Sequence, residues 1–327
     1  MSHCLNPITI KNPRFKKGKK NGLSDPYCSE EARESQRAID ACYPYIPYIQ
    51  IPCGVCLGCL RDKANEWRVR LFHEQMYGNH TSTLCLTLTV SDEYIEKFKD
   101  RKSVALCFRA FHDRLRYYTP GRRTPKHFYI SELGEKRGRL HFHGFIWDAE
   151  VRDHQIAAAW RYGFICAKPL RSYKQLAYCA KYVTKPAVRW HKPMVFCSPG
   201  LGAGYFEQQQ WIDWNHSPSD LAPINNCVKF ERFVYAMPAY YRSKIFSHVE
   251  RGNCQKVLFE SGGPRTKILG RTSYTDQRSY QEAREALYQV TLRSGKSRVR
   301  KKKPHINSDL MQMDRDKLLA DFFGSVV

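Results

Sequence analysis

The chain has no long apolar segment. None of its 327 residues belongs to an uninterrupted apolar run of about 18 residues, roughly the length that a membrane-spanning helix requires. Its beginning, MSHCLNPITIKNPRFKKGKKNG, also lacks the apolar centre of a secretory signal peptide. We therefore expect a soluble protein that works inside a cell.

Acidic residues are scarce. Aspartate and glutamate total 31, against 54 lysines and arginines, and the formal net charge is +23. Like charges in such excess repel one another in a folded protein, so they are usually balanced by an anionic partner. DNA, RNA and an anionic membrane are the candidates, and the missing membrane segments favour nucleic acid. With 42% hydrophobic residues, the chain still has enough apolar side chains for a core.

A complete phosphate-binding loop is also missing. The Gly-Lys-Ser tripeptide at Gly295–Ser297 lacks the upstream glycine of such a loop and lies in the basic run 292–303. The chain therefore shows no sign of a helicase motor. The basic run itself favours salt-sensitive affinity for DNA, or else a solvated, mobile tail.

Hydrophobic periodicity predicts an α+β fold. Apolar residues recur with a two-residue period in some segments and at helical spacing in others, in the order β, α, β, β, α, β, α. We expect strands at 83–90, 127–133, 139–147 and 163–169, and helices at 60–76, 104–118, 154–160 and 172–184. Because the second and third strands form a hairpin, we expect a central antiparallel sheet with flanking helices.

Composition divides the chain into four parts. Residues 1–52 are rich in Pro, Asn, Lys and Arg, which predicts an irregular basic arm. The periodic segments form a domain at 53–190, which opens with a cysteine-rich turn and a helix. Residues 191–291 have a weak pattern and form a C-terminal extension, and 292–327 form a basic tail with a terminal helix.

The predicted hairpin carries a candidate metal site. His141 and His143 are two residues apart on a strand, so both imidazoles project from one face. Folding the hairpin about Lys136-Arg137 places Glu132 across from His141, with Cβ atoms about 5 Å apart. Two imidazoles and a carboxylate leave coordination positions open, which suits a catalytic ion. The alternative is an ordinary His-x-His strand, since this turn is not of a favoured type and a slipped register would reverse Glu132.

The predicted helix 172–184 has a polar stripe of unusual composition. Its apolar face consists of Leu176, Ala180 and Val183. The opposite stripe presents two phenols and two ammonium groups, those of Tyr178, Tyr182, Lys181 and Lys185. Adjacent positive charge stabilises a phenolate, and a phenolate beside a polarised phosphodiester can attack phosphorus. The alternative is an ordinary amphipathic helix with a solvated polar face.

Three cysteines follow one another at metal-ligand spacing. Cys53, Cys56 and Cys59 form a double C-x2-C pattern, which is typical of structural zinc sites. Zinc would need a fourth ligand, and the upstream candidates are Cys42, Cys28 and Cys4. An iron–sulfur cluster and three reduced thiols are the alternatives. The odd total of 13 cysteines argues against a disulfide framework.

The C-terminal extension contains two further motifs. Four residues near position 240 combine rings that can stack on bases with cations that can contact phosphates: Tyr240, Tyr241, Arg242 and Lys244. A half-buried strand or turn is the alternative. The glycine-rich loop 199–204 is a candidate phosphate cradle, or else a plain turn.

Several of these segments together resemble the HUH endonucleases, and among them the replication initiators of microviruses, closest to the gokushovirus-like branch. The resemblance covers residues from about 50 to 245. It rests on Leu86-Thr87-Leu88-Thr89, His141-Phe142-His143 and Tyr178-Cys-Ala-Lys181-Tyr182-Val-Thr-Lys185, in that order, with additional support from PCGxCxxC at 52–59 and MPxYYRxK near Tyr240.

The resemblance implies a five-stranded antiparallel sheet of the HUH endonuclease type and a nuclease domain at 53–190. His141, His143 and Glu132 would bind Mg²⁺ or Mn²⁺. Tyr178 and Tyr182 would be alternating nucleophiles, with Lys181 and Lys185 near the phosphate.

The implied reaction starts and ends rolling-circle replication. The enzyme nicks a viral origin, in single-stranded or supercoiled duplex DNA, leaving a 5′-phosphotyrosine and a 3′ end that primes synthesis. With no helicase motor in the chain, the partners would be a helicase, single-strand-binding protein and polymerase of the host, in the host cell cytoplasm. A transposase or relaxase of the same class, or a non-enzymatic basic nucleic-acid-binding protein with a zinc knot, are the alternatives.

Overall fold

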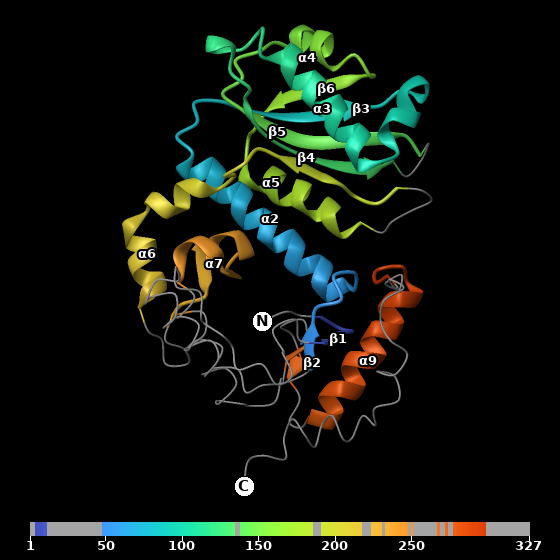
Figure 1. The fold of residues 1–327 in the computed structure, drawn as a ribbon, viewed down its shortest axis with the longest axis vertical. Helices are drawn as coiled ribbons and strands as arrows, with labels where there is room; N and C mark the ends of the chain where they lie inside the picture. Colours follow the sequence, from blue (N-terminus) through green and yellow to red (C-terminus); the bar gives the residue numbers. More distant parts are fainter. Residues whose placement is uncertain are drawn as a thin grey trace, which may run out of the picture.

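A five-stranded antiparallel sheet forms the centre of the molecule (Figure 1). The computed structural model describes residues 4–11, 48–134, 138–185, 191–217, 224–230, 233–247, 250, 267–268, 272–273 and 277–298. The sheet has the strand order β6-β3-β5-β4-β7, and each neighbouring pair is antiparallel. Its strands are β3 (Thr83–Thr89), β4 (Lys126–Leu133), β5 (Leu140–Trp147), β6 (Ile165–Pro169) and β7 (Val195–Cys197). The predicted α+β class and antiparallel sheet are confirmed.

The hairpin β4–β5 has the register predicted from its pattern. Glu132 pairs with His141, and the N–H of Gly134 donates to the carbonyl of Arg139 at 2.8 Å. A shift by one residue would expose Phe142, which is fully buried. Burial of such a side chain stabilises the fold by about 1.5–3 kcal/mol, so the core fixes the register although the turn sequence is unfavourable.

Helices cover both faces of the sheet (Figure 1). The face that carries Leu86, Leu88 and Phe142 packs against α3 (Arg101–Leu115) and α4 (Asp153–Trp160). The other face packs against α2 (Leu57–Tyr77) and α5 (Tyr173–Lys181). Because strand side chains alternate, His141, His143 and Glu132 share the second face with the tyrosine helix.

Helix α5 begins and ends with defined local structure. The side-chain oxygen of Gln175 accepts hydrogen bonds from the N–H groups of Arg171 and Ser172 at its start. The α-helix ends at Lys181 and continues as a 3-10 turn, Tyr182–Thr184. Other 3-10 turns lie at Asp92–Phe98, Pro120–Arg122 and Ala203–Glu207.

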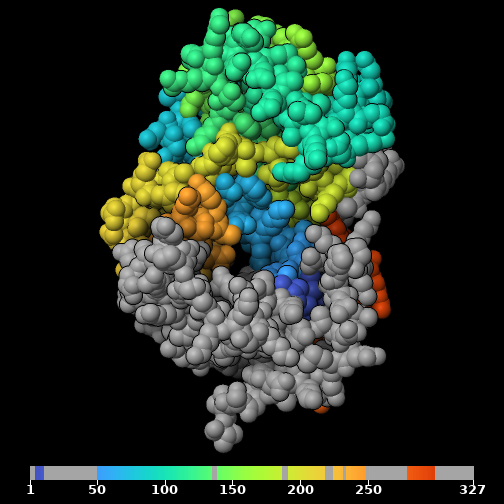
Figure 2. All heavy atoms as spheres, viewed as in Figure 1, coloured from blue at the N-terminus to red at the C-terminus, as the bar shows by residue number. Residues whose placement is uncertain are grey.

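The C-terminal extension packs along α2. It contains α6 (Gln209–His216), β8 (Cys227–Phe230), β9 (Phe233–Ala236) and α7 (Ala239–Ile245). In the space-filling view this extension, yellow to orange, lies beside the blue α2 (Figure 2). Gly202, with φ +82°, lies so close to α2 that a Cβ there would be 2.9 Å from the carbonyl oxygen of Arg70. The glycine-rich loop is therefore a turn packed on a helix, which favours the simpler of its two interpretations.

The beginning and end of the described chain pack together. β1 (Ile8–Lys11) pairs with β2 (Tyr48–Ile51), and α9 (Gln277–Arg293) follows the short strands β10 (Lys267–Ile268) and β11 (Thr272–Ser273). The expected irregular arm thus contains two paired strands. Each has only four residues, too few for a two-residue period to stand out.

The described start of the basic run is packed, which corrects the expectation of a solvated tail as far as residue 298. Ser297 is buried, and its hydroxyl accepts a hydrogen bond from the N–H of Leu57 at 2.9 Å. The rest of the basic run, 299–303, lies outside the described residues. Among the described helices, none has the length and apolar character needed to cross a membrane.

Candidate active site

The two histidines of β5 are oriented by hydroxyl groups of the neighbouring strand. The Nδ1 atom of His141 lies 3.1 Å from the Thr89 hydroxyl, and that of His143 lies 3.2 Å from the Thr87 hydroxyl. Since both Nδ1 atoms face β3, the Nε2 atoms are the nitrogens that remain to bind something else. The Nε2 atom of His143 lies 2.9 Å from a carboxylate oxygen of Glu132.

Glu132 has two cationic or polar partners. Its second carboxylate oxygen accepts a hydrogen bond from the ammonium group of Lys185. Burial opposes ionisation of Glu132, but the hydrogen bonds from His143 and Lys185 outweigh it and hold the pKa of the carboxyl below its ordinary value. Glu132 is therefore an ionised carboxylate at neutral pH, as a metal ligand must be.

Tyr182 lies against the metal-ligand candidates and is nearly closed off from solvent. Its ring stacks on His143 with centroids 4.5 Å apart and planes 7° apart, and Tyr182 is only 7% exposed. Burial raises the pKa of its phenol well above the ordinary value, and Tyr178 and Glu132 add to this rise. The Lys185 ammonium nitrogen lies 5.2 Å from the centre of the Tyr182 ring.

This burial corrects the expectation that the whole polar stripe of α5 is exposed. Tyr182 lies only about 60° around the helix from Cys179, which is buried against the sheet. Its long side chain can therefore reach the ring of His143. Lys181, in the middle of the stripe, is exposed as expected.

Tyr178 is the accessible phenol of the site. Its side chain is 60% exposed, and its ring contacts that of Tyr182 edge to face, with centroids 5.3 Å apart. The structure thus brings together one open phenol, one covered phenol, two imidazoles, a carboxylate and an ammonium group. All of them lie on one face of the sheet.

The donor set fits a divalent cation in its chemistry. Burial and the neighbouring His143 lower the pKa of His141, which keeps its imidazole in the neutral form that binds metals. The three groups do not form a closed cluster, however, because the ring centroids of His141 and His143 are 6.3 Å apart and Lys185 is bound to the carboxylate.

The four cysteines do form a closed cluster. The Sγ atoms of Cys4, Cys53, Cys56 and Cys59 all lie within 4.8 Å of one another, and all four residues are buried. In the part of the chain that the structure describes, no other group of three or more His, Cys, Asp or Glu residues meets this spacing. Four thiols so arranged match the ligand set of a structural zinc site.

Backbone groups support the sulfur atoms of this cluster. The N–H groups of Leu5, Cys53 and Cys56 lie 3.2–3.3 Å from sulfur atoms of the cluster. The hydrogen bond with Cys4 lowers the pKa of the Cys53 thiol to about 6. Of the three candidates for the fourth ligand the structure places Cys4 here; Cys28 and Cys42 lie outside the described residues.

The aromatic and basic segment on α7 is largely structural. Tyr241 is fully buried, stacks on Tyr205 and His73, and donates its hydroxyl to the carbonyl of Gly202 at 2.9 Å. The expectation that Tyr241 binds DNA from the surface is therefore wrong. Tyr240 and Arg242 are half-buried, and Lys244 is exposed.

The chain is similar to replication-associated proteins. Residues 83–187, which contain every candidate residue of the metal and tyrosine site, match the family model of the replication-associated protein ORF2. The chain is 27% identical over 234 residues to the Replication-associated protein ORF2 of Spiroplasma virus 4, covering 63% of this chain and 70% of that relative.

A second similarity covers less of each chain. The chain is 24% identical over 161 residues to the Replication-associated protein ORF4 of Chlamydia phage 1, covering 42% of this chain and 39% of that relative. No solved structure matches the chain. The HUH endonuclease type of its sheet therefore stays a prediction.

Proposed function

Because the chain belongs to the replication-associated protein ORF2 family and is homologous to microvirus replication proteins, we propose that it is the origin-nicking enzyme of rolling-circle replication. The observation that carries this proposal is the position of Tyr178. Its exposed phenol lies on the same face of the sheet as His141, His143 and Glu132, next to the covered phenol of Tyr182.

The first step is an attack by Tyr178 on the origin phosphodiester. The phenolic oxygen forms a bond to phosphorus, the bond to the 3′ oxygen breaks, and that oxygen leaves as a 3′ hydroxyl. The phenolic proton passes to water, which reaches this exposed side chain. The product is a 5′-phosphotyrosine, and the free 3′ hydroxyl primes synthesis.

The charged residues around Tyr178 have separate roles in this proposal. His141, His143 and Glu132 would hold Mg²⁺ or Mn²⁺, which neutralises charge on the phosphate when it is bound. Lys181, one turn from Tyr178 on the exposed stripe, attracts the phosphate. Lys185 neutralises Glu132 and can turn to the phosphate once the cation takes its place.

The two tyrosines act in a fixed order. Tyr182 is covered and its pKa is raised, so it is a poor nucleophile in this arrangement. We assign the first cleavage to Tyr178 and the second, which ends a round of replication, to Tyr182 after it is uncovered. The 3′ hydroxyl released by the second cleavage then attacks the first phosphotyrosine, which closes the DNA circle and frees Tyr178.

The remaining partners follow from what the chain contains. The four-cysteine cluster would bind a structural Zn²⁺. Viral origin DNA would be the substrate in the host cytoplasm. The host helicase, single-strand-binding protein and polymerase would unwind, cover and copy it.

A covalent adduct tests this function. The protein is mixed with Mn²⁺ and labelled single-stranded DNA that contains candidate origins. We expect a protein–DNA adduct that survives boiling in detergent, disappears with a chelator and is absent in the double variant Tyr178→Phe, Tyr182→Phe. An adduct that persists in this variant would show that the nucleophile is elsewhere.

A further inference from the structure

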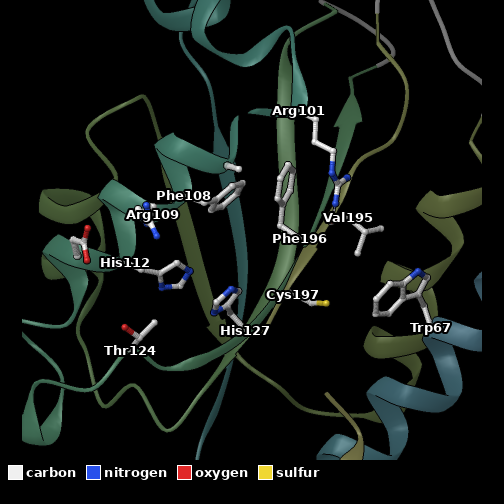
Figure 3. Close-up of a pocket in the computed structure, with 12 residues that line it drawn as sticks. Trp67, Arg101, Phe108, Arg109, His112, Thr124, His127, Val195, Phe196 and Cys197 are labelled. Atoms are coloured by element: carbon white, nitrogen blue, oxygen red, sulfur yellow. Dashed lines mark hydrogen bonds between the residues drawn. The ribbon is translucent and has the colours of Figure 1, made fainter. Parts of the chain in front are cut away.

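A cavity opens at the edge of the sheet, along β7 (Figure 3). Its volume is about 600 Å³, and it lies between α3 and the side chain of Trp67 on α2. Flat rings, guanidinium groups and imidazoles line it together, among them Trp67, Phe196, Arg101, Arg109, His112 and His127. None of these residues belongs to the candidate active site.

The aromatic wall is rigidly supported. Phe196 packs against Phe108, with ring centroids 5.2 Å apart. The guanidinium of Arg101 lies 4.9 Å from the centre of the Phe196 ring and donates a hydrogen bond to the carbonyl of Val195 at 2.9 Å. Arg101 therefore covers the open edge of β7 and leaves its positive charge at the cavity.

Two imidazoles supply hydrogen-bonding atoms of both kinds. His112 stacks on His127 with centroids 4.0 Å apart, and both of its ring nitrogens are buried without a hydrogen-bond partner among the described residues. Burial, with the neighbouring His127 adding to it, lowers the pKa of His112, so its ring is neutral, with one donor and one acceptor nitrogen. Such groups are costly when unpaired, and a ligand with a polar flat ring would satisfy them.

Positive charge continues from the cavity toward the tyrosine segment. Burial lowers the pKa of Lys63, and the charges of Lys192, Arg101 and Arg298 lower it further. A second, smaller hollow is lined by Lys63, Lys192, Arg298 and by Val183 next to Tyr182. The guanidinium of Arg298 also donates to the carbonyl of Lys185.

The sheet register sets the distance between cavity and active site. Val195 pairs with Ile130, and Ile130 pairs with His143. Since neighbouring strands are about 4.8 Å apart, the cavity edge lies roughly 10 Å across the sheet from His143. One bound strand of nucleic acid can therefore touch both places.

We propose that this edge groove, formed by the cavity with Lys63, Lys192 and Arg101, binds the single-stranded DNA next to the scissile phosphate and takes one base into the cavity. This inference rests on the proposed function. Cations that follow a backbone and rings that stack on bases are the two components of sequence-tolerant single-strand binding. An acidic protein partner would use the cations but neither the rings nor the neutral imidazoles.

DNA affinity of a variant that cannot nick tests the groove apart from catalysis. In the Tyr178→Phe, Tyr182→Phe background, fluorescence anisotropy measures binding of a labelled oligothymidine. We expect Arg101→Gln with Arg109→Gln to weaken binding about tenfold, which two phosphate or stacking contacts would account for. Lys102→Gln with Lys168→Gln removes the same charge from exposed positions outside the cavity and should change binding less than about twofold. Equal losses in both pairs would overturn the proposal.

Cross-linking locates the bound base. Oligonucleotides with a single 5-iodouracil are irradiated with the protein and the linked peptide is identified by mass spectrometry. We expect linkage to Trp67, Phe196 or His127. Linkage confined to other surfaces, or competition by polyglutamate as effective as that by DNA of equal charge, would overturn the proposal. Adduct formation with an unchanged affinity of the Arg101, Arg109 pair would refute the groove alone, whereas groove binding without any adduct would refute the nicking function.

Discussion

Glu132 connects the sheet to the tyrosine segment at the level of single side chains. It lies opposite His141 in the register, touches His143 through one oxygen and binds Lys185 through the other. The same carboxylate that holds Lys185 in this arrangement would become a metal ligand when the ammonium moves away. The residue thus has a binding partner in either state, which avoids an unpaired buried charge.

The pH dependence of stability should report the ion pair of Glu132. Its pKa is lowered in the folded protein, so the stabilisation is present above the unfolded value, near about 4.3, and is lost as the pH falls through the lower folded value. We expect the melting temperature of Glu132→Gln to fall less than that of the wild type over this acidic range. Parallel curves for the two proteins would contradict the ion pair.

The two tyrosines should differ sharply in a single turnover with metal and origin DNA. Tyr178→Phe is expected to reduce the first adduct by at least about 100-fold, because it removes the exposed nucleophile. Tyr182→Phe should leave the first adduct within about threefold but prevent the second transfer. Gel quantification and peptide mapping of the adduct measure both. Wild-type adduct found mainly on Tyr182 would reverse the assignment.

At the level of elements, local patterns predicted the pieces and their immediate neighbours. The two-residue period of the hairpin correctly placed Glu132 across from His141, because adjacent strands fix that contact locally. The helical period correctly placed Ala180 on the buried face of α5. Both predictions depend on residues fewer than about a dozen positions apart, where backbone geometry alone determines which side chains meet.

Contacts between distant elements were beyond those patterns. Tyr182 is buried because α5 lies over His143 of another element, and Tyr241 because α7 packs against α2. A helical period cannot show where the buried arc of a helix ends. Likewise, nothing in the sequence singles out Cys4 from Cys28 and Cys42, since its position follows from the pairing of two short strands. For Cys4 the spacing rule narrowed the choice and the fold made it.

The four-cysteine cluster should act as a joint between elements. It lies where the chain start, the beginning of α2 and α9 meet, in a core that includes Tyr280 and Tyr288. We expect Cys4→Ser to lose most of about one bound zinc per chain and to melt several degrees lower, because a tetrathiolate site becomes incomplete.

A matched control for this variant is Cys166→Ser, which changes a half-buried thiol on β6 outside the cluster. It should keep its zinc. Metal analysis and thermal melting distinguish the two. Wild-type protein purified without chelator that contains no zinc would count against the joint.

On the scale of the whole molecule, the two faces of the sheet have different tasks. The face under α3 and α4 is an aromatic and aliphatic core. The face under α2 and α5 carries the candidate site, and the chain returns to it from far away in sequence through Arg298. A segment whose composition resembled a free tail thus supports the tyrosine segment, which only the assembled fold could reveal.

The excess of positive charge predicts strongly salt-dependent DNA binding. Each phosphate contact to a single strand contributes about 0.7 to the slope of log affinity against log salt concentration. Replacing Arg101 and Arg109 with glutamine should therefore reduce the slope by about 1.4, if both contact phosphates. Titrations at several salt concentrations measure this. An unchanged slope would place the phosphate contacts elsewhere on the surface.

The central claim is that a cation on the sheet and the phenol of Tyr178 act on the same phosphodiester. The most direct measurement replaces one non-bridging oxygen of the scissile phosphate with sulfur and follows the Tyr178 adduct with Mg²⁺ and with Mn²⁺. Since sulfur is a softer ligand than Mg²⁺ accepts, we predict that one diastereomer loses most adduct with Mg²⁺ and recovers it with Mn²⁺. Equal adduct formation from both diastereomers with both metals would contradict the claim.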